Sequence, residues 1–267
     1  MIKNLKVHKA LWLLIACLSL VAACIGVFNQ DIYSKVVSSD WLPGTIAQDA
    51  ITIIVGLVLL FLSLKTNESD IRKQIIATSL LVYLFYGYSL YVIEQLYTSL
   101  YILYMAIVAL SFWSIVYSLV NIKQDVLRHI KASKLVRYLS AGCLIFISLL
   151  FYSLWTSQLL TLMRTGDKIE FTYSIYIIDM VFVLPALIMS AILLIKKNAL
   201  GLIFAPILFI KAFTLLFSVG LGGLFKLLYN QTVASGEIAF YFILSAIFLA
   251  LAVLNFWKIS FQEQNKS

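Results

Sequence analysis

Residues 48–65 read QDAITIIVGLVLLFLSLK, and this stretch decides the fold. Asp49 stands near its start, a predominantly apolar run follows, and Lys65 closes it. The 16 residues from Asp49 to Lys65 rise about 25 Å as a helix, slightly less than the roughly 30 Å hydrocarbon core of a bilayer. The stretch therefore predicts a membrane-spanning helix with an acid just inside one membrane face and a lysine at the other.

A second stretch, residues 178–196, reads IDMVFVLPALIMSAILLIK and has the same design. Asp179 opens it and Lys196 closes it after 17 residues. Acids inside membrane segments are costly and usually functional. We therefore expect both aspartates to belong to polar sites.

The composition extends this interpretation to the whole chain. Of 267 residues, 63% are hydrophobic and 12% are charged, whereas soluble domains have about 45–50% apolar and about 25% charged residues. The sequence predicts an all-α polytopic membrane bundle in contact with lipid, without a separate soluble domain. Eight apolar segments are expected, at about 10–28, 46–64, 74–93, 99–120, 138–157, 172–195, 200–221 and 237–257.

The basic residues predict the orientation. With a cytoplasmic N-terminus, 15 lysines and arginines fall on inside segments and four on outside segments, which is a positive-inside bias. We expect both termini in the cytoplasm and the protein in the cell membrane. The net charge of +8 belongs to membrane loops and does not indicate nucleic acid.

The order of segments predicts an internal repeat. Residues 1–135 and 136–267 each hold four spans, and the second span of each half carries the aspartate. Because four is an even number, both halves share one orientation, so we expect a parallel repeat.

Metal and cofactor chemistry is not expected. The cysteines lie in apolar runs, and His8 and His129 lie in basic flanks, so no metal-ligand spacing, disulfide framework or catalytic motif is present. Cys24 ends a Val-Ala-Ala-Cys run that resembles a lipoprotein cleavage box, although an uncleaved first helix is the simpler interpretation.

Asp179 and Lys211 form the first candidate pair. Their predicted depths on adjacent segments let them meet, because a lysine side chain can extend several Å along a helix. The pair is either a structural ion pair or a site that binds a ligand or a proton; a Schiff-base lysine is a third, less favoured option. Pro185 is expected to kink the segment below Asp179.

Asp49 and Gln48 form the second candidate site, after the turn residues Pro43 and Gly44. Asp49 either complements the helix dipole in the first turns or lines a pocket together with Gln48. Tyr83 and Tyr86 lie deep, three residues apart on one face, and tyrosines beside carboxylates suit a cation. The tyrosines near the outer ends of the third and fourth segments fit an interfacial aromatic belt.

Glu94 adds to an acidic outer face. Ordinary solvation explains such acids, and attraction of cationic solutes to an outward cavity is the functional alternative. The other acids of this face are Asp31, Asp40, Asp167, Glu170 and Glu237.

A resemblance adds to this reading. Ala47-Gln48-Asp49, Tyr176-Ile177-Ile178-Asp179 followed by Pro185, and Lys211 resemble a group of bacterial multi-pass membrane proteins of unknown function. The resemblance implies the fold over most of the chain and implies no chemistry.

Three classes of function stay open. The first is a carrier or binding protein for a small solute, with cations among the candidates, and with an outward pocket built from Asp49, Asp179, Lys211 and tyrosines. The second is a non-catalytic sensor or partner subunit of a membrane complex. The third is a membrane enzyme that acts on lipid or quinone, although we lean away from an enzyme because no catalytic motif is present.

Overall fold

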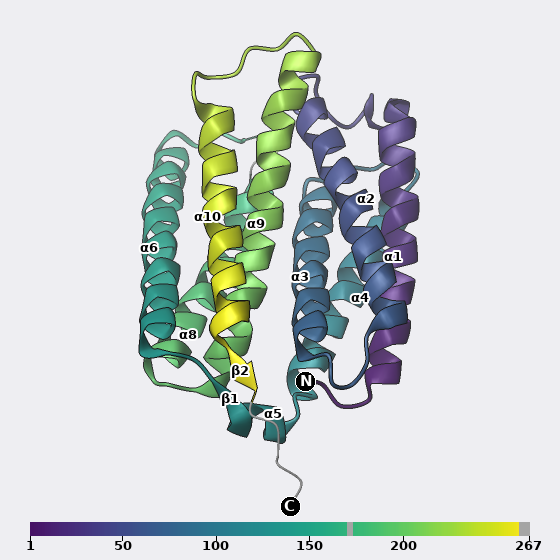
Figure 1. Ribbon diagram of the computed structural model, residues 1–267. Coiled ribbons are helices and arrows are strands. Elements are labelled where there is room, and N and C mark those ends of the chain that lie inside the picture. The colour runs from purple at the N-terminus through teal and green to yellow at the C-terminus, as the bar shows by residue number, and fades with distance from the viewer. Residues whose placement is uncertain (170–172, 262–267) are drawn as a thin grey trace, which may run out of the picture. The chain divides into compact units, whose positions relative to one another are not determined.

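The structure is a computed structural model that describes residues 1–169 and 173–261 (Figure 1). Glu170, one of the acids of the predicted outer face, and residues 262–267 lie outside the described residues. Within the described ranges, eight helices are long and apolar enough to cross a membrane. The expected all-α polytopic membrane protein with eight spans is confirmed.

Local signals set where the helices begin and end. Pro43 lies in the first turn of α2 (Leu42–Lys65), where its missing N–H leaves no hydrogen bond broken. Ser133 caps α6 (Lys134–Thr165) by accepting a hydrogen bond of 3.3 Å from the Val136 N–H. Gly166 ends α6 with a φ of 74°, which glycine adopts without strain.

Two helices extend well beyond the C-terminal ends that hydropathy predicted for them. α6 continues to Thr165 and α9 (Ala199–Leu228) continues to Leu228, beyond the expected ends at residues 157 and 221. Both extensions carry polar residues, such as Gln158 and Lys226, which a helix tolerates outside hydrocarbon. Hydropathy therefore located the apolar part of each helix and missed its polar end.

Contacts divide the chain into two compact units. Unit 1 comprises Met1–Lys123 with Phe209–Ala250, and unit 2 comprises Gln124–Leu208 with Leu251–Ser267. α9 and α10 (Glu237–Lys258) each have one part in either unit. The expected repeat divides the chain by the order of its segments in the sequence, whereas these units divide it by contacts. The repeat of residues 1–135 and 136–267 stays a prediction.

Unit 1 contains the first four spans, which contact one another in a group (Figure 1). α3 is the most deeply buried of the eight spans, because 72% of its apolar 18-residue stretch is buried inside the protein. Besides α2, the elements of this group are α1 (Leu5–Phe28), the short 3-10 helix η1 (Gln30–Tyr33), α3 (Ile71–Ile93) and α4 (Tyr101–Val120).

The end of unit 1 at which α1 begins, here called the Met1 end, is held by polar contacts between segments far apart in the chain. The Lys3 N–H donates to the Asn121 carbonyl at 2.8 Å, and the Lys123 N–H donates to the Met1 carbonyl at 2.8 Å. Lys123 also pairs with Glu68 at 2.8 Å. The start of α1 therefore lies beside the end of α4, and the two helices run antiparallel.

The opposite end of unit 1, called the Tyr33 end, holds the loop of residues 29–41. Two contacts tie this loop to the segment after α9. Tyr229 donates to the Gln30 side chain at 2.6 Å, and Gln231 donates to the Ser39 carbonyl at 2.7 Å. The loop is thereby fastened over the ends of the helices of unit 1.

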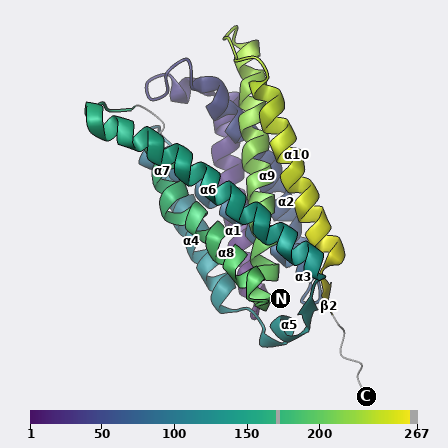
Figure 2. The ribbon, with the colours of Figure 1, turned by 90° about the vertical axis from the view of Figure 1, so that its left-hand side faces the viewer.

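Unit 2 is built on α6, which packs against α8 (Leu184–Ile195) (Figure 2). A π-helical turn, η2 (Asp179–Val183), separates α8 from the preceding α7 (Tyr173–Ile178). Pro185 was expected to disturb the helix here, because proline has no N–H to donate to the carbonyl four residues earlier. That carbonyl belongs to Val181, which lies within the π-helical turn. The remaining elements are α5 (Gln124–His129) and the antiparallel pair β1 (Ile130–Lys131) and β2 (Ser260–Phe261).

Candidate functional site

Asp49 is the eighth residue of α2 and lies inside unit 1, with 2% of its surface exposed. Its carboxyl group accepts two hydrogen bonds from phenols. Tyr33 donates to Oδ2 at 2.6 Å, and the Tyr91 hydroxyl lies 3.1 Å from Oδ1. Because Asp49 lies beyond the second turn of α2, the expected role in the first turns of the helix is wrong, and the carboxyl belongs to a tertiary contact.

The tyrosines around Asp49 come from three elements. Tyr33 lies on η1, Tyr88 and Tyr91 lie on α3, and Tyr104 lies on α4; together they are here called the tyrosine cluster. The Tyr91 and Tyr104 rings are 5.2 Å apart at their centroids, and the Tyr33 and Tyr91 rings are 6.4 Å apart. All four rings are buried, so the expected aromatic belt is wrong for Tyr91 and Tyr104, which lie near the predicted outer ends of their segments.

Tyr33 holds a proton firmly in this setting. It lies between two spans, and burial raises the pKa of its phenol, with the negative charge of Asp49 raising it further. The phenol is therefore the donor and the carboxyl oxygen the acceptor in the 2.6 Å contact.

Gly26 on α1 leaves the space that the carboxyl group occupies. A Cβ at this position would overlap Oδ2 of Asp49 and would lie 2.6 Å from the Tyr33 hydroxyl. Glycine, the only residue type without a Cβ, therefore stands where α1 passes the Asp49 carboxyl group.

Gln48 and Tyr83 form a second polar layer beside Asp49. Gln48 donates from Nε2 to the Gly87 carbonyl at 3.0 Å. The Tyr83 hydroxyl lies 3.4 Å from the Thr52 hydroxyl and 3.4 Å from the Gln48 carbonyl. The structure therefore brings three of the predicted site residues, Gln48, Asp49 and Tyr83, onto one α2–α3 contact.

Lys211 on α9 lies over the face of Tyr86, with Nζ 3.7 Å from the ring centroid. Both residues are buried, and Lys211 is only 4% exposed. The negative face of an aromatic ring attracts a cation, so this contact offsets part of the cost of burying the ammonium group. Two more of the predicted site residues are thereby brought together within unit 1.

Asp179 opens the π-helical turn of unit 2 and is 9% exposed. Trp155 on α6 donates from its indole N–H to Oδ2 at 3.1 Å. No pattern in the sequence indicated that Trp155 is the partner of Asp179. Asp179 and Lys211 belong to different units, and the ion pair expected between them stays a prediction.

Glu94 follows the last residue of α3 and is half-buried. Asp31, Asp40 and Asp167 are exposed, as solvated acids would be. The attraction of cationic solutes to these acids stays a prediction.

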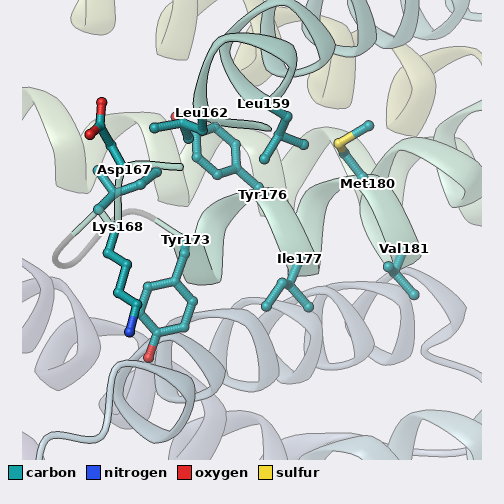
Figure 3. A pocket seen from close by; sticks show the side chains of 10 residues that line it. Leu159, Leu162, Asp167, Lys168, Tyr173, Tyr176, Ile177, Met180 and Val181 are labelled. Carbon is teal, nitrogen blue, oxygen red and sulfur yellow. The ribbon is translucent and has the colours of Figure 1, made fainter. Parts of the chain in front are cut away.

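A shallow hollow of about 570 Å³ lies in unit 2, between the end of α6 and the α7–η2 segment (Figure 3). Its wall is mostly apolar, with Leu159, Tyr176, Ile177 and Met180 among its residues, and Asp167 and Lys168 stand at one side. None of the predicted site residues lines it.

The described residues contain no group of three or more His, Cys, Asp or Glu side chains that could hold a metal ion. The predicted site residues that the structure brings together in unit 1 offer the Asp49 carboxyl group, the Gln48 amide, the Tyr83 phenol and the Lys211 ammonium group, and Tyr33 and Tyr91 add two phenols. Such a set can bind a proton or a small cation and can position hydrogen-bonding groups.

No protein-family model matches this chain, and no curated protein or solved structure matches it either. The fold and the site themselves define the class: an integral membrane protein whose described residues form eight helices long and apolar enough to cross a membrane. More particularly, it is a membrane protein in which a buried carboxyl group is enclosed by tyrosines from three elements.

Proposed function

We propose that this protein binds a small cationic solute at Asp49 and carries it across the membrane. The observation that supports the proposal is the set of partners around the carboxyl group. Its hydrogen bonds come from the phenols of Tyr33 and Tyr91, which are neutral. A negative charge buried among neutral groups at this depth is costly, and a bound cation offsets that cost.

The aromatic surroundings suit the same kind of ligand. Tyrosine faces attract ammonium and guanidinium groups, and tyrosine hydroxyls accept hydrogen bonds from them. Unit 1 already holds one ammonium group in this way, because Lys211 lies 3.7 Å from the Tyr86 ring centroid. We infer that the solute is a small organic cation, recognised by one carboxylate and by tyrosine rings.

Access to Asp49 requires a movement of the loop that carries Tyr33. Tyr33 is fully buried and Gly26 leaves no spare space beside the carboxyl group. The solute therefore takes the place of the Tyr33 hydroxyl on Oδ2, and the loop of residues 29–41 opens to admit it. The bias of basic residues supports a cell-membrane location with both termini in the cytoplasm and this loop outside.

The experiment is a thermal-stability screen of the purified protein with ammonium, methylammonium, tetramethylammonium and guanidinium at constant ionic strength. A cation that binds the folded state at 100 times its Kd stabilises it by about 2.7 kcal/mol, and we expect such a shift for at least one of them. Asp49→Asn removes the charge and should abolish the shift. Asp31→Asn, an exposed acid at the same end, is the matched control and should keep it.

The same cation should then accumulate in proteoliposomes that contain the protein and should not accumulate with Asp49→Asn. An equal stability shift in Asp49→Asn would contradict the assignment of the site. A shift without accumulation would contradict transport and would leave a binding protein.

A further inference from the structure

The contact between α1 and α4 near the Met1 end of unit 1 is lined by polar side chains. α1 contributes His8 and Trp12, four residues apart, and α4 contributes Ser111, Ser114 and Ser118. These spacings place each set on one face of its helix. All five residues are at most 1% exposed, although His8 stands in a basic flank of the sequence. This group is called the α1–α4 seam.

One hydrogen bond fixes the register of the seam. The Ser118 hydroxyl lies 3.3 Å from Nδ1 of His8, and the His8 ring stacks on Tyr117 with centroids 4.6 Å apart. Because the two helices are antiparallel, one turn along α1 from His8 corresponds to one turn back along α4 from Ser118. Trp12 is therefore level with Ser114, and Ser111 follows a turn further from the Met1 end.

Four polar atoms of this seam have no hydrogen-bond partner among the described residues: Nε2 of His8, Nε1 of Trp12, and the hydroxyls of Ser111 and Ser114. An unpaired buried polar group costs about 1–3 kcal/mol, and native proteins contain few of them. Four along consecutive turns of a single helix contact indicate a shared partner.

The chemistry of the four atoms specifies that partner. Nε1 of Trp12 can only donate, the serine hydroxyls can donate and accept, and Nε2 of His8 does one or the other according to its tautomer. A ligand that serves them all must both donate and accept, must be small enough to fit between two packed helices, and must be available inside the protein. Water meets these requirements, and buried water typically makes two to four such bonds.

The seam stops short of the tyrosine cluster. By the same register, Ile15 on α1 is level with Ser111 and Ile107 on α4 is level with Ser19, and both isoleucines are fully buried. At the level of Ser19, Tyr88 donates to the Ser19 carbonyl at 3.2 Å. Tyr88 belongs to the cluster around Asp49. The polar seam on α4 thus ends at Ser111, and the buried Ile107 takes the next turn of that helix.

We propose that the α1–α4 seam is a buried water-binding site, in which ordered water connects His8, Trp12, Ser114 and Ser111. The site brings water from the Met1 end to within about one helical turn of the contact between Tyr88 and Ser19. The proposal is independent of the role of Asp49, and it holds whether or not Asp49 binds a cation.

Radiolytic labelling of the full-length protein in detergent, with ¹⁸O-labelled water, tests it. Hydroxyl radicals formed from bound water oxidise the side chains beside it, so Trp12 should be labelled although it is fully buried. Phe209, equally buried, should stay unlabelled. The double variant Ser111→Ala with Ser114→Ala should reduce the labelling of Trp12 several-fold. Absence of label on Trp12, or labelling that the variant does not change, would overturn the proposal.

Thermal stability provides a second, independent test of bound water in the seam. Alanine in place of a hydroxyl that binds water removes a hydrogen bond and should lower Tm, whereas alanine in place of an unpaired hydroxyl removes a penalty and should raise it. We expect the double variant to have a lower Tm than the wild type. Ser148→Ala is the control, because the Ser148 hydroxyl bonds its own helix at the Leu144 carbonyl. A higher Tm for the double variant would show that the seam is dry.

Discussion

Replacing Gly26 by alanine should destabilise the protein, although glycine is normally the poorer residue inside a helix. The gain in helix propensity is about 0.5–1 kcal/mol. Against it stands the new Cβ, which would overlap Oδ2 of Asp49 and lie 2.8 Å from its Cγ. Inserting a methyl group into a packed site costs about 1–3 kcal/mol, so we expect a net loss of up to about 2.5 kcal/mol.

The assay is equilibrium unfolding in mixed micelles, with a matched control in another helix. A Cβ at Gly142 of α6 would meet nothing within 4 Å, so Gly142→Ala should stabilise the protein by about 0.5–1 kcal/mol. Asp49→Ala should relieve the clash, so that the double variant with Gly26→Ala loses less than the sum of the two single changes. If Gly26→Ala matches or exceeds the wild type in stability, Asp49 does not lie against α1 as described.

Two further predictions concern ion pairs. Asp179→Asn and Lys211→Met should each lower Tm, because removing one partner of a buried pair leaves an uncompensated charge that typically costs about 3–5 kcal/mol. The double variant should lose less stability than the sum of the two single variants. Simple additivity of the two losses in thermal unfolding would refute the pair. At the Met1 end, the hydrogen bond from Lys123 and its positive charge lower the pKa of Glu68 below its ordinary value of 4.5. The contribution of Glu68 to stability is therefore fully present above the ordinary pKa, and it is lost as the pH falls through the lowered pKa. The difference in Tm between wild type and Glu68→Gln should therefore shrink as the pH falls from 7 toward 3, and a difference that grows would contradict the pairing.

The apolar segments and their number followed from the sequence because membrane insertion is a local property. A run of about 20 apolar residues buries itself in lipid whatever its neighbours are. For the same reason, an acid such as Asp49 inside such a run could be identified as a polar site without knowledge of its partners. Gln48, Asp49 and Tyr83 were named separately as candidate site residues, and the structure places the Tyr83 hydroxyl 3.4 Å from the Gln48 carbonyl, next to Asp49 in the chain.

The partners themselves depended on tertiary structure. Tyr33 is 16 residues before Asp49 and Tyr91 is 42 residues after it, and no periodicity relates residues on different elements. Tyr91 looked interfacial because it lies near the end of its segment, yet the loop that carries Tyr33 covers it. His8 looked like part of a basic flank, yet α4 packs over it. Which element covers which side chain is a property of packing between distant segments, so the enclosure of Asp49 and the polar seam beside α4 were decided only by the fold.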